Sequence, residues 1–329
     1  MTAPMIEAFS LQQLAHSNWT TLNLDSFLLK GEVVRRWANG MFSNNIRALT
    51  PGHGNASAIC DDRGRIMSFA NLYCLHDEAF VCVLTGQNKT WFDSKFEMLM
   101  MLDDIETETI STEIFHIFGE TSKYLLHEIG IHADILPNSI HTQDDVWVCA
   151  HNRFGCTGFD ICSSSSEKRE EIRSLLTSKM PPTSETAMES LRVYMELPSF
   201  TRDCTDKSFI HELQQQDKLC AFNKGCYVGQ EIINRMDIKG LVTKKLLRLE
   251  VSQMPSLPCT VIFEDKEQGN VTSVGHIVDT DGRDRFFVLA TLRKELWVPN
   301  VAVTIAMEHD GVENGTVSGT IASLGISTT

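Results

Sequence analysis

Apolar residues along the first 200 positions follow two different spacings. Three segments, 56–60, 66–75 and 79–84, are strand-like and are separated by short polar turns. Five segments have the spacing of one apolar helix face, and four of these precede a glycine or proline that favours a helix end: 32–39, 91–102, 121–129, 166–179 and 186–197. The pattern therefore predicts an antiparallel meander with helices packed on it, which is an α+β fold.

Beyond Lys244 the helical spacing gives way to short strands. These strands and the turns between them are expected at 246–251, 260–263 and 286–290, with turns at 266–270 and 279–284. A chain of 329 residues exceeds the usual size of one hydrophobic core. We therefore predict a larger region at 1–243 and a separate C-terminal β-barrel at 244–329.

Charge and the lengths of apolar runs exclude several classes of protein. The chain has 29 Lys and Arg against 43 Asp and Glu, and its net charge of −14 repels nucleic acid and anionic membranes. No apolar run reaches the roughly 20 residues that span a bilayer. The N-terminus has neither a signal pattern nor a transit pattern. We expect a cytoplasmic protein with no direct nucleic-acid contact and no membrane association.

Common catalytic and metal-binding motifs do not occur in the sequence. It has no Walker A sequence, no G-x-G-x-x-G before a helix, no H-E-x-x-H and no G-x-S-x-G. The ten cysteines form no C-x-x-C pair, which excludes a zinc ribbon, and most of them are expected to be buried and reduced. We predict no metal site.

One cysteine lies in an unusual local sequence, the octet 224–231, which reads K-G-C-Y-V-G-Q-E. Gly225 and Gly229 flank Cys226 and allow positive φ on both sides, which predicts a tight and exposed bend. A short helix opening at Gly229 and running through Arg235 would place its positive end near the sulfur, and the Lys224 ammonium would add to this field and favour the thiolate. The alternative is a loop cysteine that only packs.

The octet resembles the signature of the YgfZ-type proteins of the GcvT-like folate-binding family, which include mitochondrial iron–sulfur assembly proteins. Weaker similarity to this family covers further segments of the first 245 residues, at 39–45, 61–66, 153–160 and 209–213. The resemblance implies a GcvT-like multi-domain ring around a central folate cavity. In this arrangement residues 1–243 would form two intertwined α+β subdomains, and 244–329 the barrel.

The resemblance also implies a function, a cofactor and partners. The protein would bind tetrahydrofolate and assist the assembly or repair of iron–sulfur enzymes, with Cys226 as the functional thiol and only an indirect link to tRNA modification. Its partners would be iron–sulfur enzymes or assembly proteins. The residues that would bind the cofactor are Asn44, Arg153, Tyr194, Lys224, Tyr227, Gln230, Glu231 and Arg235. A basic run from Arg235 to Arg248 would either line the cavity rim or form a solvated face.

Two departures from the family pattern bear on chemistry. Alignment on Arg192 and Pro198 puts Tyr194 where relatives have the acid that binds the pterin, which predicts weak folate binding. Ser68 and Phe69 occupy the hairpin positions of the aspartate that aminomethyltransferases use, so catalysis of that transfer is not expected. Two alternatives remain, a folate-dependent one-carbon transferase or demethylase, and a scaffold in which Cys226 is structural.

Overall fold

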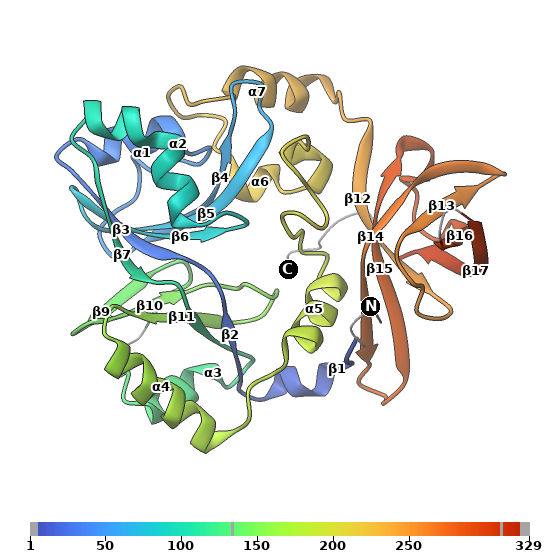
Figure 1. Cartoon of the computed structure of the whole chain (residues 1–329), viewed down its shortest axis with the longest axis horizontal. Coiled ribbons are helices and arrows are strands. Elements are labelled where there is room, and N and C mark those ends of the chain that lie inside the picture. The colour runs from blue at the N-terminus through green and yellow to red at the C-terminus, as the bar shows by residue number, and fades with distance from the viewer. Residues whose placement is uncertain (1–5, 133–134, 310–311, 323–329) are drawn as a thin grey trace.

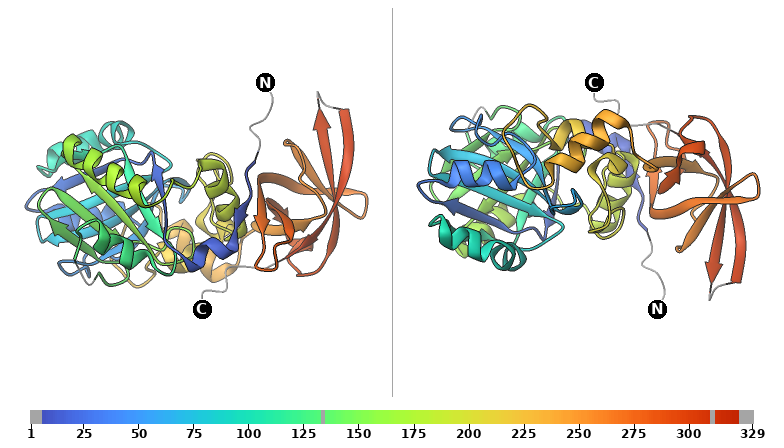
Figure 2. Two further views of the ribbon diagram at one scale, coloured as in Figure 1. Left: turned by 90° about the horizontal axis from the view of Figure 1, so that it is seen from below. Right: turned by 90° about the horizontal axis from the view of Figure 1, so that it is seen from above.

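The computed structural model describes residues 6–132, 135–309 and 312–322. Two five-stranded sheets stack on each other, and helices cover the outer face of each, so this part of the molecule has four layers (Figure 1). A β-barrel lies beside the layered part, and helix α5 (Glu185–Tyr194) lies between the two (Figure 1). The two further views agree that the barrel is a separate lobe (Figure 2).

The first sheet contains the predicted meander, whose three strands pair antiparallel and in sequence order. Its strands in spatial order are β4 (Gly54–Cys60), β5 (Ile66–His76), β6 (Ala79–Thr85), β3 (Ser26–Lys30) and β7 (Glu106–Ser111). Strand β6 is apolar at nearly every position because both of its faces are buried: Phe80 and Cys82 pack among the helices, while Val81 and Val83 pack between the sheets. The outer helices are α1 (Val34–Met41) and α2 (Lys89–Leu102).

The second sheet repeats this arrangement on the opposite side. Its strands in spatial order are β2 (Asn18–Leu22), β8 (Ile114–Phe118), β11 (Gly158–Ser163), β10 (Val146–Ala150) and β9 (Ile140–Gln143). Helices α3 (Ser122–Glu128) and α4 (Ser166–Lys179) cover its outer face (Figure 1). The two sheets share an apolar core to which Ile114, Cys149 and Cys162 contribute from this side.

The barrel closes because its third and fourth strands in the chain, β14 and β15, also pair with each other. Its strands in chain order are β12 (Lys244–Val251), β13 (Cys259–Phe263), β14 (Lys266–Val278), β15 (Asp284–Arg293), β16 (Ala302–His309) and β17 (Val312–Ile321). The short strand β1 (Phe9–Ser10) pairs in parallel with β14, so the N-terminal part of the chain also touches the barrel. The remaining elements are η1 (Leu11–Ala15), η2 (Ile210–Leu213), α6 (Gln216–Leu219), α7 (Gln230–Lys239) and η3 (Lys294–Leu296).

The predicted α+β fold with a C-terminal barrel is confirmed, whereas one predicted turn is wrong. Residues 266–270 belong to β14, and the turn lies at Glu264 and Asp265, which have φ of 49° and 60°. Gly269 lies within the predicted turn, yet a Cβ there would lie 1.9 Å from the carbonyl oxygen of Thr291 on the neighbouring strand. This glycine therefore marks a close approach of two backbones inside the sheet.

Two other predicted boundaries are the end of the helix at 186–197 and the domain boundary after residue 243. The helix predicted at 186–197 ends at Tyr194, because Glu196 has a φ of 56° and so cannot continue it. The domain boundary after residue 243 stays a prediction, although β12 begins at Lys244. No helix among the described residues is long and apolar enough to cross a membrane.

A buried charge cluster joins α5, the segment that follows it, and the barrel. The guanidinium of Arg192 donates to both carboxylate oxygens of Glu189, at 2.8 and 2.6 Å, to Asp203 at 2.5 Å, and to the hydroxyl of Ser273 on β14 at 2.6 Å. Asp203 also accepts from the hydroxyls of Thr272 and Ser273, at 2.6 and 2.7 Å. Every charge in this cluster is therefore paired without water, which is the condition for keeping it in a core.

Removing one partner should destabilise the protein strongly. Asp203→Asn removes one of the two counter-charges of the buried Arg192, the one that also accepts from barrel strand β14, and we expect a loss of about 3–5 kcal/mol in the free energy of unfolding. Urea denaturation at neutral pH measures this loss. Asp206→Asn, at an exposed position three residues away, is the matched control and should change stability by less than about 0.5 kcal/mol. Equal stability of the two variants would show that the cluster does not hold the lobes together.

Acid should weaken the same cluster through Glu189. Burial alone would raise the pKa of this carboxyl group, but the hydrogen bonds and charge of Arg192, aided by Arg202, lower it below its ordinary value of 4.5. The stability that it contributes is therefore complete above pH 4.5 and is lost as the pH falls below that value. Glu189→Gln should be less stable than wild type at pH 7, and the difference should shrink in urea titrations below pH 4.5. A difference that is constant across this range would contradict the assignment.

Candidate functional site

A cavity of about 240 Å³ lies where the two sheets, the segment after α5, and α6 meet. Its apolar wall includes Leu22, Phe69, Phe154 and Leu219, and its neutral polar groups are Asn71, Thr85, Ser199 and Gln215. Pockets that enclose a drug-sized ligand have roughly 300–1,000 Å³. This cavity can therefore enclose one ring system of such a ligand and leave the rest outside.

The ionisable groups that line the cavity are all basic. They are His151, Arg153, Arg192 and Lys218, and no Asp or Glu of the described residues is in the lining. Burial, with the nearby charge of Arg153, lowers the pKa of His151 well below its ordinary value and keeps this imidazole neutral. Arg192 is fully occupied by the cluster described above.

Asp160 is the counter-charge of Arg153 and lies behind the cavity wall. It is 1% exposed, and it accepts hydrogen bonds from His116 Nδ1 at 2.7 Å and from Arg153 through Nε, at 3.3 Å, and through Nη2. Burial alone would raise the pKa of this carboxyl group, but the charge of Arg153 and the bond from His116 hold it well below its ordinary range. Asp160 therefore stays ionised and fixes the guanidinium at the cavity wall.

The hairpin that carries the aspartate in aminomethyltransferases has no acid facing the cavity. Its turn forms as predicted, with Asp61 Oδ1 accepting from the backbone N–H groups of Arg63 and Arg65 at 3.0 and 2.8 Å. Ser68 is fully buried and its hydroxyl donates to the Thr85 carbonyl at 3.2 Å. Phe69 does line the cavity, and it presents an apolar ring where a carboxylate would be needed.

Cys226 is the one exposed cysteine of the ten. It lies outside the cavity lining, on the loop between α6 and α7. Gly229 is the N-cap of α7 with a φ of 83°, and a Cβ there would lie 2.6 Å from the carbonyl oxygen of Asp61, so the loop packs closely against the hairpin turn. The prediction for Gly225 is wrong, since this residue does not have positive φ. The exposed position of the Cys226 sulfur therefore depends on the loop between α6 and α7 and on Gly229, and not on a pair of glycines with positive φ.

Lys224 anchors this loop to the end of α1. Its ammonium donates to the carbonyl oxygens of Asn39, Phe42 and Asn44 at 2.6, 2.6 and 2.7 Å, and lies 4.7 Å from the centre of the Tyr227 ring. Burial lowers its pKa to about 8. Both residues are among those described, and no hydrogen bond joins Lys224 to the Cys226 thiol. The predicted effect of the Lys224 charge on the thiol stays a prediction.

The other candidate residues are distributed over three places. Arg153 alone of them lines the central cavity. The amide of Asn44 donates to the carbonyl oxygens of Ala56 and Lys218 at 2.8 and 3.1 Å, and Gln230 accepts from the backbone N–H of Tyr227 at 3.3 Å, so both support the backbone. The buried Tyr227 ring packs under Lys224. Glu231 and Arg235 are exposed on α7.

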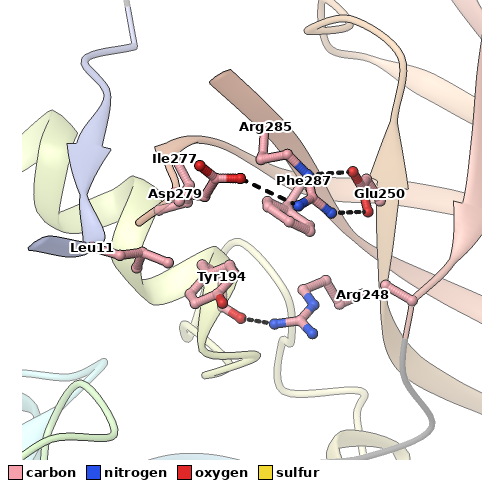
Figure 3. Close-up of a pocket in the computed structure, with 9 residues that line it drawn as sticks. Leu11, Tyr194, Arg248, Glu250, Ile277, Asp279, Arg285 and Phe287 are labelled. Atoms are coloured by element: carbon pink, nitrogen blue, oxygen red, sulfur yellow. Dashed lines mark hydrogen bonds and ion pairs between the residues drawn. The ribbon is translucent and has the colours of Figure 1, made fainter. Parts of the chain in front are cut away.

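Tyr194 lines a second pocket, of about 230 Å³, between α5 and the barrel (Figure 3). The guanidinium of Arg248 lies over its ring at 5.0 Å and donates to its carbonyl oxygen. Arg285 and Glu250 form a bidentate ion pair on the opposite wall, at 2.6 Å for each bond. Arg248 is thus used at an interface, and no residue of the basic run from Arg235 to Arg248 lines the central cavity.

The sequence reasoning missed His151, Asp160 and Lys218. Asp160 was included in a family-like segment but was not given a role. Lys218 follows three glutamines and an aspartate, a stretch that carries no motif. His151 directly follows β10, two positions before Arg153, and it lines the cavity without belonging to a motif.

Comparisons with known proteins identify the fold. No protein-family model matches the chain. A chloroplastic protein of Arabidopsis thaliana, described as a "putative transferase", is 20% identical over 293 residues, which cover 86% of this chain and 67% of that protein. The crystal structure of glycine cleavage system aminomethyltransferase T from Bartonella henselae superposes with a TM-score of 0.83 at 16% identity, covering 97% of this chain and 88% of that chain. At this identity the likeness shows the fold alone, and the chain has the GcvT-like fold that its sequence predicts.

Proposed function

We propose that this protein is a YgfZ-type accessory factor, which binds tetrahydrofolate in the central cavity and assists iron–sulfur enzymes through Cys226. The observation that carries the proposal is the separation of two features. The cavity has an apolar wall with cationic groups and no acid from the described residues, whereas the exposed thiol lies outside it. A cavity of this kind suits recognition of an anionic, ring-containing ligand better than catalysis on it.

The folate part of the proposal rests on the fold and on the cavity's composition. Phe69 and Phe154 supply ring-sized apolar surface, while Asn71 and Gln215 can pair with pterin edge atoms. Because Tyr194 lies in the other pocket and no described acid lines the cavity, the pterin N–H groups would meet only neutral acceptors. The resulting affinity for tetrahydrofolate is therefore weak.

The iron–sulfur part rests on the octet around Cys226 and on the state of the other cysteines. Burial raises the pKa of eight of them, to about 11 for Cys156 and Cys220 and to about 12 for Cys162 and Cys204. The exposed loop presents one thiol to a cluster or to a protein partner. Partners would be iron–sulfur enzymes or assembly proteins, and any effect on tRNA modification would arise through such enzymes.

A one-carbon transferase on the same fold is the second candidate. It is favoured by the likeness to an aminomethyltransferase and by the transferase description of the Arabidopsis protein. The lining of the cavity opposes it, because a cationic one-carbon intermediate would meet Arg153 and Lys218 with no described carboxylate to stabilise it.

Cys226 should react first among the ten cysteines and should be required for function. Alkylation with limiting iodoacetamide at pH 7, mapped by mass spectrometry, should label Cys226 before any other, because the rest are buried or have raised pKa values. In an iron–sulfur-deficient strain that the wild type rescues, Cys226→Ser should fail and Cys156→Ser should succeed. Cys156 is the matched control, since it is the one other cysteine that is not fully buried. Rescue by Cys226→Ser would remove the thiol from the mechanism.

Aminomethyl transfer should be absent in the wild type. The assay measures methylene-tetrahydrofolate formed from an aminomethyl-lipoyl carrier protein and tetrahydrofolate. Phe69→Asp restores a carboxylate at the cavity wall and should raise any trace activity relative to Phe69→Asn, which has the same shape without the charge; one preorganised electrostatic partner is worth roughly 10²–10³ in rate. Wild-type turnover near that of an aminomethyltransferase would favour the second candidate.

A further inference from the structure

Lys218 is a cation without a partner at the cavity. It lies on α6, where its carbonyl oxygen accepts from the Asn44 amide at 3.1 Å, so its backbone is held in place. Its side chain lines the cavity. The ammonium makes no hydrogen bond and no ion pair with any residue that the structure describes. Desolvation of the ammonium by the surrounding protein, and then the charge of Arg153, lower its pKa, although the residue as a whole is exposed.

The neighbouring charges leave Lys218 uncompensated. Asp160 already neutralises Arg153 and also accepts from His116. Glu189 and Asp203 accept hydrogen bonds from Arg192 and neutralise its charge. Arg153 uses Nε and Nη2 for Asp160, while its Nη1 donates to none of the described residues. The cavity thus offers one whole positive charge and one free guanidinium NH2 group, that of Arg153 Nη1.

We propose that Lys218 and the free N–H of Arg153 form an oxyanion subsite, which takes a carboxylate or phosphate group of the cavity's ligand. The ammonium supplies up to three donors and the guanidinium a directed one, which is the donor set that oxyanions prefer in proteins. Charge-assisted hydrogen bonds gain strength where water is partly excluded. The apolar wall beside them, with Phe69 and Phe154, makes the ligand class a ring system that carries an oxyanion.

The subsite rests on the proposed function only in the identity of the ligand, tetrahydrofolate. Tetrahydrofolate has two carboxylates and so fits the ligand class, and a phosphate-bearing ring compound fits it equally well. The subsite concerns the oxyanion alone, so it can be tested with small anions even if folate does not bind.

The first experiment measures the subsite without any folate. Limiting acetic anhydride labels accessible amines, and mass spectrometry gives the labelling rate of each lysine. Inorganic phosphate or succinate should slow acetylation of Lys218 severalfold and leave Lys207 unchanged, since both lysines are exposed but Lys207 does not line the cavity. Protection by one anion and not the other supports the subsite and identifies the oxyanion it takes. Absence of protection by both anions overturns the proposal.

The second experiment compares two ligands that differ in their carboxylates. Calorimetry gives the affinity of wild type, Lys218→Met and Lys207→Met for tetrahydrofolate and for 6-methyltetrahydropterin, which has no carboxylate. Lys218→Met should weaken tetrahydrofolate binding by roughly tenfold or more, the effect of losing a charged hydrogen-bond partner. It should not change binding of the pterin. Methionine preserves most of the side-chain length, and no described contact is broken, so the variant should fold.

The outcomes separate the two proposals. If tetrahydrofolate binds wild type and Lys218→Met equally, the folate assignment stands and the subsite is wrong. If tetrahydrofolate does not bind wild type but phosphate or succinate protects Lys218, the subsite stands and the folate assignment falls.

Discussion

The arrangement of the molecule depends on the pairing of one buried guanidinium, that of Arg192. A charge this far from water is tolerated only when every donor has an acceptor, and the acceptors come from α5, from the segment that follows it and from barrel strand β14. The three elements are therefore fixed relative to one another. Leu197 and Ser199 line the cavity from the segment that Arg192 holds, so the same pairing shapes one wall of the candidate site.

The need to neutralise buried charge also explains why the Lys218 ammonium remains unpaired in the cavity. Asp160 stabilises Arg153 and His116 from behind the wall, and its two oxygens are used for this purpose. No acid lies among the described lining residues, so Lys218 keeps its charge available. A carboxylate would stabilise a cationic intermediate, whereas an unpaired cation such as Lys218 destabilises it. The described lining of this cavity has the unpaired cation and no carboxylate.

The sequence predicted an element well where the residues that begin or end it are its neighbours in the chain. Helix α4 was predicted with its observed bounds from its spacing and the two prolines that follow it, and the structure adds that Ser165 caps its other end. Strand β14 was misread because Gly269 serves a close approach to Thr291, a contact between strands that the sequence does not display. The residues that line the cavity were more difficult to predict. Arg153 was predicted from a family-like segment. Lys218 was not, because a short helix, α6, brings it to a sheet that is distant in the sequence.

The cavity and the Cys226 loop share one support, the segment from Asn39 to Asn44. On one side Ser43 and Asn44 donate to the carbonyl oxygens of Leu219 and Lys218, at 2.6 and 3.1 Å, and hold α6 against the cavity. On the other side the carbonyls of this segment accept from the Lys224 ammonium, which holds the loop. The first connection uses the side chains of Ser43 and Asn44, and the second uses backbone carbonyl oxygens of the same segment. The helix that presents Lys218 to the cavity and the loop that presents Cys226 to solvent are therefore both positioned by this one segment, although the thiol itself lies outside the cavity.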